Sequence, residues 1–304
     1  MFISLDIPPD VTEQMLWADY AEIRALVHPD SCFSLGDLSG IAQRRRDTGG
    51  GFPADVRWRD ILNFVDTRVH EFGAAYPFEI SDDQDTISLS FDGSRAQTVY
   101  LGLLLASSMR TLEKRRRNAV ARVFEEASFL IFQRLMPTGS QVRPTWAGAG
   151  GLAPYQGTLF EKLSALAKDL RCSPNFSAAD FNANDRGDGG MDIVAWHPMS
   201  DTRPGMPIAI AQCGCSRDDW EFKQLEAHPV KHRYRLPTMH PWSNFYFMPL
   251  DFRRADGDWA KKSDLGEVII VDRLRLLRLA EEHGLWGQMP AMDFVTEAQA
   301  TDYL

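Results

Sequence analysis

Two oxygen-bearing side chains stand at matching ends of two predicted strands, and their chemistry is that of a metal site. Asp192 follows the sequence GDGG within the apolar run 191–196, and Gln212 lies in the next apolar run, 208–215. Because side chains alternate along a strand, Asp192 and Gln212 can lie beside each other on neighbouring strands. Carboxylate and amide oxygens are ligands that Mg²⁺ prefers. The pattern therefore predicts a site for Mg²⁺ or Mn²⁺ at this end of a hairpin.

The hairpin is predicted from its two apolar runs and from the turn residues around them. The connector SDTRPG has the Gly, Pro, Asp and Ser content of a loop, and GDGG has the composition of a tight turn. Asp188 fits the role of a turn residue. Asp192 fits it less well, because it already lies in an apolar strand, where a carboxylate needs a partner or a metal.

The sequence GDGGMD, followed by a strand and then by Gln212, resembles the PD-(D/E)XK nuclease superfamily, in particular Mrr-type restriction endonucleases. In that family a helix with a Glu precedes the strand with the metal-binding Asp, and the second strand carries Glu or Gln, one residue, then Lys. The resemblance covers roughly residues 157–225. It implies that Asp192, Gln212 and Glu161, the last on the predicted helix 157–170, are metal ligands and catalytic residues.

The lysine position departs from this family pattern, because residue 214 is glycine. In some superfamily members the lysine stands on the following helix. Lys223, in the predicted helix 217–227, is the residue that matches such a displaced lysine. The resemblance implies that Lys223 stabilises charge or helps to activate water.

The activity that the resemblance implies is Mg²⁺-dependent endonucleolytic hydrolysis of phosphodiester bonds in DNA. The implied setting is bacterial restriction or anti-phage defence. An alternative from another class is a catalytically inactive nuclease fold that serves as a binding or regulatory subunit of a defence complex. Gly214 in place of lysine favours this alternative.

A structural zinc site is a second alternative. Two cysteines and two histidines have a spacing close to that of zinc fingers, namely Cys213, Cys215, His228 and His232. The two cysteines, however, are closer in sequence than in the usual zinc knuckle. Pro229 also interrupts the helix that would carry the histidines.

The net charge of −9 argues against a protein that coats nucleic acid indiscriminately, although a site built from carboxylates is acidic anyway. One basic segment, KHRYR, follows the predicted site helix and interleaves cations with an aromatic residue. Its Lys231, Arg233 and Arg235 are predicted to contact the phosphate backbone of DNA, the expected partner.

The sequence does not have the features of a membrane protein or of a secreted protein. The longest apolar run, 99–106, is far shorter than the roughly 18 residues of a membrane span, and the N-terminus lacks the pattern of a secretory signal. Four cysteines without a pattern do not form a disulfide framework. We therefore expect a cytoplasmic protein with no membrane partner. Homo-oligomerisation and contacts with other defence proteins remain open.

The order of predicted elements indicates an α/β fold. A helix, two strands, a helix and a further strand follow one another in 157–304, and the resemblance makes this part a restriction-endonuclease-like core, a mixed sheet flanked by helices. Residues 1–136 are predicted to form a mainly helical N-terminal domain. The segment 137–156, rich in Pro and Gly, is predicted to be the linker between the two.

Overall fold

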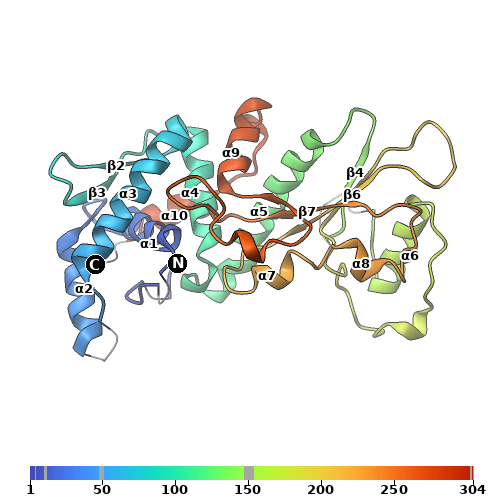
Figure 1. Cartoon of the computed structure of the whole chain (residues 1–304), viewed down its shortest axis with the longest axis horizontal. Coiled ribbons are helices and arrows are strands. Elements are labelled where there is room, and N and C mark those ends of the chain that lie inside the picture. The colour runs from blue at the N-terminus through green and yellow to red at the C-terminus, as the bar shows by residue number, and fades with distance from the viewer. Residues whose placement is uncertain (4, 10–11, 48–50, 147–153, 302, 304) are drawn as a thin grey trace. The chain divides into compact units, whose positions relative to one another are not determined.

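The chain forms two structural units, each assembled from segments that are far apart in sequence (Figure 1). The computed structural model describes residues 1–304 except 4, 10–11, 48–50, 147–153, 302 and 304. Unit 1 comprises Met1–Phe124, Pro249–Ser263 and Asp272–Leu304. Unit 2 comprises Glu125–Met248 and Asp264–Val271.

These units differ from the predicted domains. Unit 1 ends within helix α5 (Lys114–Leu135), and it regains 249–263 and 272–304, which the prediction assigned to the second domain. The predicted linker 137–156 contains strand β4 (Gln141–Pro144), while its residues 147–153 lie outside the described residues. A short strand that ends in proline fits a sheet edge, where the missing N–H breaks no ladder, and it gives little periodicity in the sequence.

Unit 1 is mainly helical, as predicted for the N-terminal half. Its helices are α1 (Gln14–Val27), α2 (Leu35–Asp47), α3 (Ala54–Phe72), α4 (Arg95–Ser107), α9 (Arg273–Glu282) and α10 (Asp293–Gln299). A small antiparallel sheet has the order β1-β3-β2, with strands β1 (Cys32–Ser34), β2 (Phe78–Ile80) and β3 (Thr86–Leu89). Short 3-10 turns are η1 (Gly73–Ala75), η2 (Met109–Thr111) and η6 (Trp286–Gln288).

A buried network of charges explains why the later segments belong to unit 1. The guanidinium of Arg68 lies 2.7 Å from Asp19, 2.6 Å from Glu22 and 2.9 Å from Asp251. Arg273 lies 2.8 Å from the same Asp19. Buried charges are tolerated only when paired, so the folding of α1 and α3 requires the return of the chain at Asp251 and Arg273.

In the described part of the chain, unit 2 contains a five-stranded mixed sheet of order β4-β5-β6-β7-β8, which confirms the α/β class. Strands β4, β5 (Ile193–Trp196) and β6 (Ile208–Cys213) are antiparallel, whereas β7 (Ser243–Phe247) and β8 (Ile269–Val271) run parallel to β6. The further helices are α6 (Leu159–Asp169), α7 (Trp220–Lys223) and α8 (Pro229–His232), with short turns η4 (Ala178–Asp180) and η5 (Lys262–Asp264), the latter at the boundary between the units. The predicted hairpin is thus confirmed as β5 and β6.

Helices cover both faces of this sheet. On one face α6 places Leu163 and Leu166 in a core with Val194 and Ile210, which are opposite each other in the register of β5 and β6. The other face packs against α5, whose Phe132 ring lies 5.2 Å from that of Phe245. By strand alternation, Asp192 and Gln212 belong to the α6 face, at its end.

Candidate functional site

The turn that leads into β5 requires glycine. Gly189 and Gly190 have φ angles of 74° and 80°, in the region that favours glycine. A Cβ atom on Gly190 would also lie 2.6 Å from the Cβ of Glu226. Asp188 closes the turn, since its Oδ1 accepts a hydrogen bond from the Gly190 N–H at 2.8 Å. The sequence GDGG thereby fixes the backbone immediately before Asp192.

Asp192 is a buried carboxylate, with 5% of the residue exposed. Its Oδ2 accepts a 2.6 Å hydrogen bond from the N–H of Cys213, and its N–H donates to the carbonyl of Ala211 at 2.9 Å. Burial raises the pKa of the Asp192 carboxyl well above its usual value, and the nearby carboxylates of Asp188 and Glu125 raise it further. Such a group calls for a proton or a cation.

Gln212 lies on β6 beside this carboxylate. The register pairs Ile193 with Ala211, so the next position places Asp192 opposite Gln212 on the same face of the hairpin. The side chain of Gln212 is buried, and its Oε1 has no hydrogen-bond partner among the residues that the structure describes. Most buried amide oxygens in proteins accept a hydrogen bond, so this oxygen is available to a ligand or a water. The predicted pair Asp192 and Gln212 is therefore brought together.

Glu161 does not join this pair through any contact that the structure describes. It is exposed, and its Oε2 accepts hydrogen bonds from the N–H and the hydroxyl of Thr158 at 2.7 and 3.0 Å. These bonds form the capping box at the start of α6 and hold the pKa of the Glu161 carboxyl below its usual value. The structure thus gives Glu161 a role in helix capping instead of the predicted place beside Asp192.

Helix α6 contacts the loop that precedes Asp192 through Lys162 instead of Glu161. The buried Lys162 Nζ donates to the carbonyls of Arg186 and Gly187 at 2.8 and 3.1 Å. The N–H of Leu159 donates to the carbonyl of Asp185 at 2.8 Å. The helix therefore positions the strand entry that carries Asp192, although its own carboxylate points elsewhere.

The acidic side chain that the sequence reasoning missed is Glu125, half-buried on α5. In addition to burial, the negative charge of Glu125 raises the pKa of Asp192 and of two thiols at the end of β6, those of Cys213 and Cys215. Burial first, then Asp192 and Glu125, raise the pKa of Cys213, and burial followed by Glu125 raises that of Cys215. No local sequence pattern marks this glutamate, because its position depends on the packing of α5 against the sheet.

Lys223 lies at the end of α7, half-buried. Its ammonium opposes the rise in the pKa of Cys215 that burial and Glu125 produce, so Lys223 and Glu125 both lie near this thiol. Cys215 follows β6 two residues after its end. Lys223 therefore lies near the end of β6.

The predicted nucleic-acid contacts fall into two groups. Lys231 and Arg233 are exposed, as is Tyr234 between Arg233 and Arg235, with 71% of its surface accessible. Arg235 is half-buried instead, and its guanidinium lies 5.0 Å from the centre of the Phe181 ring. Arg233 and Tyr234 also line a pocket of about 630 Å³. Lys231 and Arg233 thus stand at the surface, whereas Arg235 packs on an aromatic ring.

The zinc alternative finds no support in the described residues. His232 Nε2 lies 2.7 Å from the carbonyl oxygen of Glu226, and His228 Nδ1 accepts a hydrogen bond from the N–H of Val230 at 3.2 Å. Across those residues, no three His, Cys, Asp or Glu side chains gather closely enough to hold a metal ion. The histidines serve local structure.

The oxygen donors around Asp192 still fit Mg²⁺. This ion keeps several waters and takes one or two protein carboxylates together with substrate phosphates, so it does not need three acidic side chains. The unpartnered Oε1 of Gln212 and the buried carboxyl of Asp192 supply two oxygens on adjacent strands. In addition to burial, the half-buried carboxylates of Asp188 and Glu125 both raise the pKa of Asp192.

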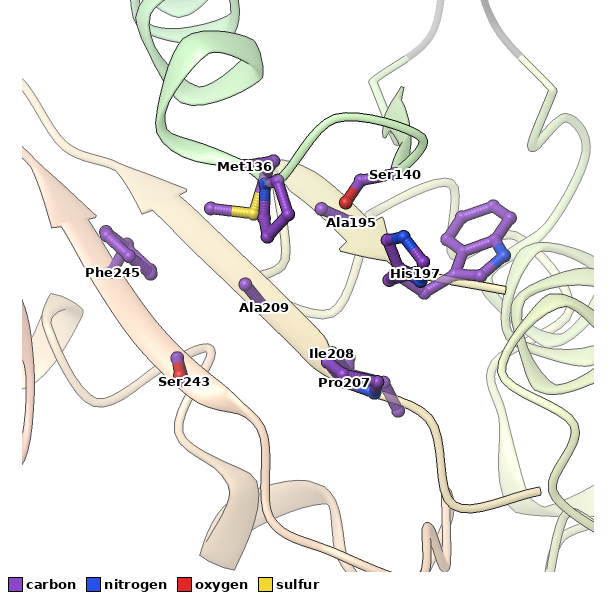
Figure 2. Close-up of a pocket in the computed structure, with 11 residues that line it drawn as sticks. Met136, Ser140, Ala195, His197, Pro207, Ile208, Ala209, Ser243 and Phe245 are labelled. Atoms are coloured by element: carbon purple, nitrogen blue, oxygen red, sulfur yellow. The ribbon is translucent and has the colours of Figure 1, made fainter. Parts of the chain in front are cut away.

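A separate pocket of about 220 Å³ lies at the other end of the same strands (Figure 2). Its floor is a row of small side chains that are paired across three strands, Ala195, Ala209 and Ser243. His197 and Phe245 form parts of its wall. The candidate site does not include this pocket, because Asp192 and Gln212 stand at the opposite strand ends.

Two further findings bear on function. Over the residues that are described, no helix has both the length and the apolar character to cross a membrane. No protein-family model, curated protein or solved structure matches the chain.

Proposed function

We propose that this chain is a metal-dependent nuclease of the PD-(D/E)XK class that hydrolyses phosphodiester bonds in DNA. The observation that carries the proposal is the pairing of buried Asp192 with the unpartnered Gln212 across the hairpin of β5 and β6. Burying an ionised carboxylate is costly unless a partner or a metal offsets the loss of solvation.

The order of elements in unit 2 supports a restriction-endonuclease-like core. The strand that Asp192 precedes is followed by the strand of Gln212, then by α7, and then by β7 in parallel with β6. Helices precede this hairpin and cover both faces of a mixed sheet. The family resemblance implies the first part of this order, a helix followed by two strands and a further helix.

The protein residues divide the chemistry among them. Asp192 and Gln212 would hold Mg²⁺, and Glu125 would orient the ligands or the water around it. Mg²⁺, when bound, supplies a Lewis acid that neutralises phosphate charge and favours ionisation of a water. Lys223 would place a positive charge beside the phosphate, where negative charge grows during hydrolysis.

Substrate binding would fall to the exposed cations that follow α7. Lys231 and Arg233 can pair with backbone phosphates, and the exposed ring of Tyr234 offers an apolar surface between them and Arg235. A role in bacterial restriction or anti-phage defence, in the cytoplasm, is the setting that the resemblance implies.

The direct test is cleavage of supercoiled plasmid by the purified chain. We expect nicked and linear products with Mg²⁺ or Mn²⁺, and none with EDTA or with Ca²⁺ in place of Mg²⁺. A parallel assay with single-stranded RNA of matched length determines whether DNA is the preferred substrate. Absence of cleavage under all metal conditions would contradict the enzymatic proposal.

The second candidate is a catalytically inactive nuclease fold that binds DNA or a defence partner. Gly214, at the position where the resemblance implies lysine, is the observation that favours it. This candidate predicts retained DNA binding, sensitive to Lys231→Ala and Arg233→Ala, in the absence of any metal-dependent cleavage.

Glu125 and Glu161 provide a matched pair of substitutions. Glu125→Gln is expected to lower the cleavage rate by roughly 10- to 100-fold, the scale for a group that orients metal ligands. Glu161→Ala is expected to leave that rate nearly unchanged, because its carboxylate is bound to Thr158. Glu161→Ala should instead lower the Tm, because the capping box of α6 is lost. Initial rates at several Mg²⁺ concentrations and thermal melts measure both, and the reverse pattern would restore Glu161 as a ligand.

A further inference from the structure

Steric exclusion, and not backbone conformation, explains why residue 214 is glycine. Its φ angle is not among the positive ones, so the backbone does not demand glycine there. A Cβ atom at this position would lie 2.1 Å from the hydroxyl oxygen of Tyr246 and 2.8 Å from its Cζ. The phenol of Tyr246 therefore occupies the volume that any side chain at 214 would need, and this is where the resemblance implies a lysine.

The Tyr246 side chain is held firmly in that position. Tyr246 lies within β7, paired with Gln212 on β6 and with Ile270 on β8, and it is fully buried. The pairing continues beyond β6, since the N–H of Gly214 donates to the carbonyl of Phe247 at 2.9 Å. The ring thus projects from a central strand of the sheet with no freedom to swing away.

Within the described part of the chain, the hydroxyl of Tyr246 has no hydrogen-bond partner. Leaving a buried hydroxyl unpaired is unfavourable, and a phenylalanine would fill the same space without this cost. The pKa of Tyr246 is raised by burial first, and then by Cys215, Asp219, Cys213 and Glu226, so the phenol is a hydrogen-bond donor. One strand away, the Oε1 of Gln212 is unpartnered too.

Asp192, Gln212 and Tyr246 together form a polar row across three adjacent strands on one face of the sheet. The row follows from the antiparallel register of β5 with β6 and the parallel register of β6 with β7. Two members of this row carry buried polar atoms that lack partners, and the third is a buried acid. The register thus makes these three buried polar residues neighbours at the strand ends that the proposed function uses.

We propose that Tyr246 replaces the missing lysine by donating its hydroxyl hydrogen bond to a non-bridging oxygen of the substrate phosphate. This inference rests on the proposed nuclease function and adds a catalytic residue to that site. Tyr246 supplies the donor at the place where the family pattern has an ammonium, and Lys223 supplies the positive charge. The hydrogen-bond donor has then moved from position 214, after β6, to Tyr246 on the adjacent strand β7. Loss of lysine at 214 therefore does not imply loss of activity.

Tyr246→Phe is the first test. We expect the cleavage rate with Mg²⁺ to fall by roughly 10- to 100-fold, as for the loss of one preorganised neutral donor. The Tm of the free protein should stay the same or rise, because the hydroxyl has no partner there. The Kd for a DNA duplex in Ca²⁺ should change by less than about threefold, since a single contact is lost. Tyr155→Phe, which removes a hydroxyl bound to Asp169 in the same unit, is the matched control and should keep the wild-type rate.

Gly214→Ala tests the geometry without any activity measurement. In the wild-type background it should lower the Tm by roughly 4–10 °C, the scale of overpacking in a well-packed core. In a Tyr246→Leu background the same substitution should cost much less, because the phenol that it would meet is gone. Equal costs in the two backgrounds would overturn the steric premise.

The outcomes separate this inference from the proposed function. Wild-type cleavage together with an unimpaired Tyr246→Phe variant overturns the role of Tyr246 and leaves the nuclease intact. A Tyr246→Phe variant whose lost activity follows a lowered Tm also overturns it, since the hydroxyl would then be structural. A wild-type chain that cleaves nothing with Mg²⁺ or Mn²⁺ overturns the proposed function, and the role of Tyr246 falls with it.

Discussion

Asp192→Asn is expected to abolish Mg²⁺-dependent cleavage, with a fall of roughly three orders of magnitude or more, while the fold stays intact. The amide oxygen of asparagine can still accept the hydrogen bond that Asp192 receives from the Cys213 N–H. Only the negative charge and the second anionic oxygen are lost. A gel assay with supercoiled plasmid measures the rate.

The stability of this variant provides an independent measurement. Because burial raises the pKa of Asp192, the ionised carboxylate disfavours the metal-free fold as pH rises above the usual range for Asp. At pH 8 without metal, Asp192→Asn should therefore melt at the same temperature as the wild type or higher. Added Mg²⁺ should raise the Tm of the wild type, since it binds the folded state, and leave that of Asp192→Asn unchanged.

Asp180→Asn is the matched control for Asp192→Asn. Asp180 is an exposed carboxylate whose Oδ2 accepts hydrogen bonds from Ser177 in a local capping box. This variant should retain both cleavage and the Mg²⁺-induced rise in Tm. Undiminished cleavage by Asp192→Asn would remove Asp192 from the site and, with it, the observation on which the proposed function depends.

The hairpin could be predicted from the sequence because its signals are local. Strand alternation predicts that Asp192 and Gln212 lie beside each other, and the register that pairs Ile193 with Ala211 sets these two residues at the next paired position. The turn also follows from residue type, since Gly189 and Gly190 adopt positive φ angles. Neighbouring positions on adjacent strands are therefore the part of the site that a single sequence can specify.

The third acid could not be assigned in the same way. Thr158 and Glu161 have the spacing of a capping box, a local signal for the role that Glu161 has in the structure. Glu125 approaches Asp192 only because α5 packs on the sheet, as Phe132 does against Phe245. No local periodicity encodes a contact between a helix and a strand end that are so far apart in the chain.

The domain boundaries could not be predicted from the sequence for a related reason. Asp19 pairs with Arg273 across 254 positions, so the division of the chain depends on long-range charge pairing. The predicted linker contains β4, where Pro144 ends a short edge strand. Composition rich in Pro and Gly indicates interrupted structure, but it does not distinguish a linker from a sheet edge.

Lys223→Ala is expected to lower the cleavage rate by roughly two to three orders of magnitude, the scale for one lost electrostatic stabiliser. Lys223 is half-buried on α7, and its charge reaches Cys215, which Glu125 also affects. DNA binding in Ca²⁺ should persist, because Lys231 and Arg233 remain exposed. Lys223→Arg should restore little, since the broad guanidinium cannot replace a compact ammonium in a confined place.

Lys231→Ala separates a catalytic role of Lys223 from a general contribution to charge. Both substitutions remove one ammonium from neighbouring helices, but Lys231 is exposed on α8. Its loss should raise KM and weaken the salt dependence of binding while kcat changes little. Lys223→Ala should instead lower kcat with KM nearly constant. If Lys223→Ala also raises KM and leaves kcat nearly unchanged, Lys223 is a surface cation. The search for the catalytic cation then moves to Arg217, which stands before α7, and a DNA-binding module becomes the better account of the fold.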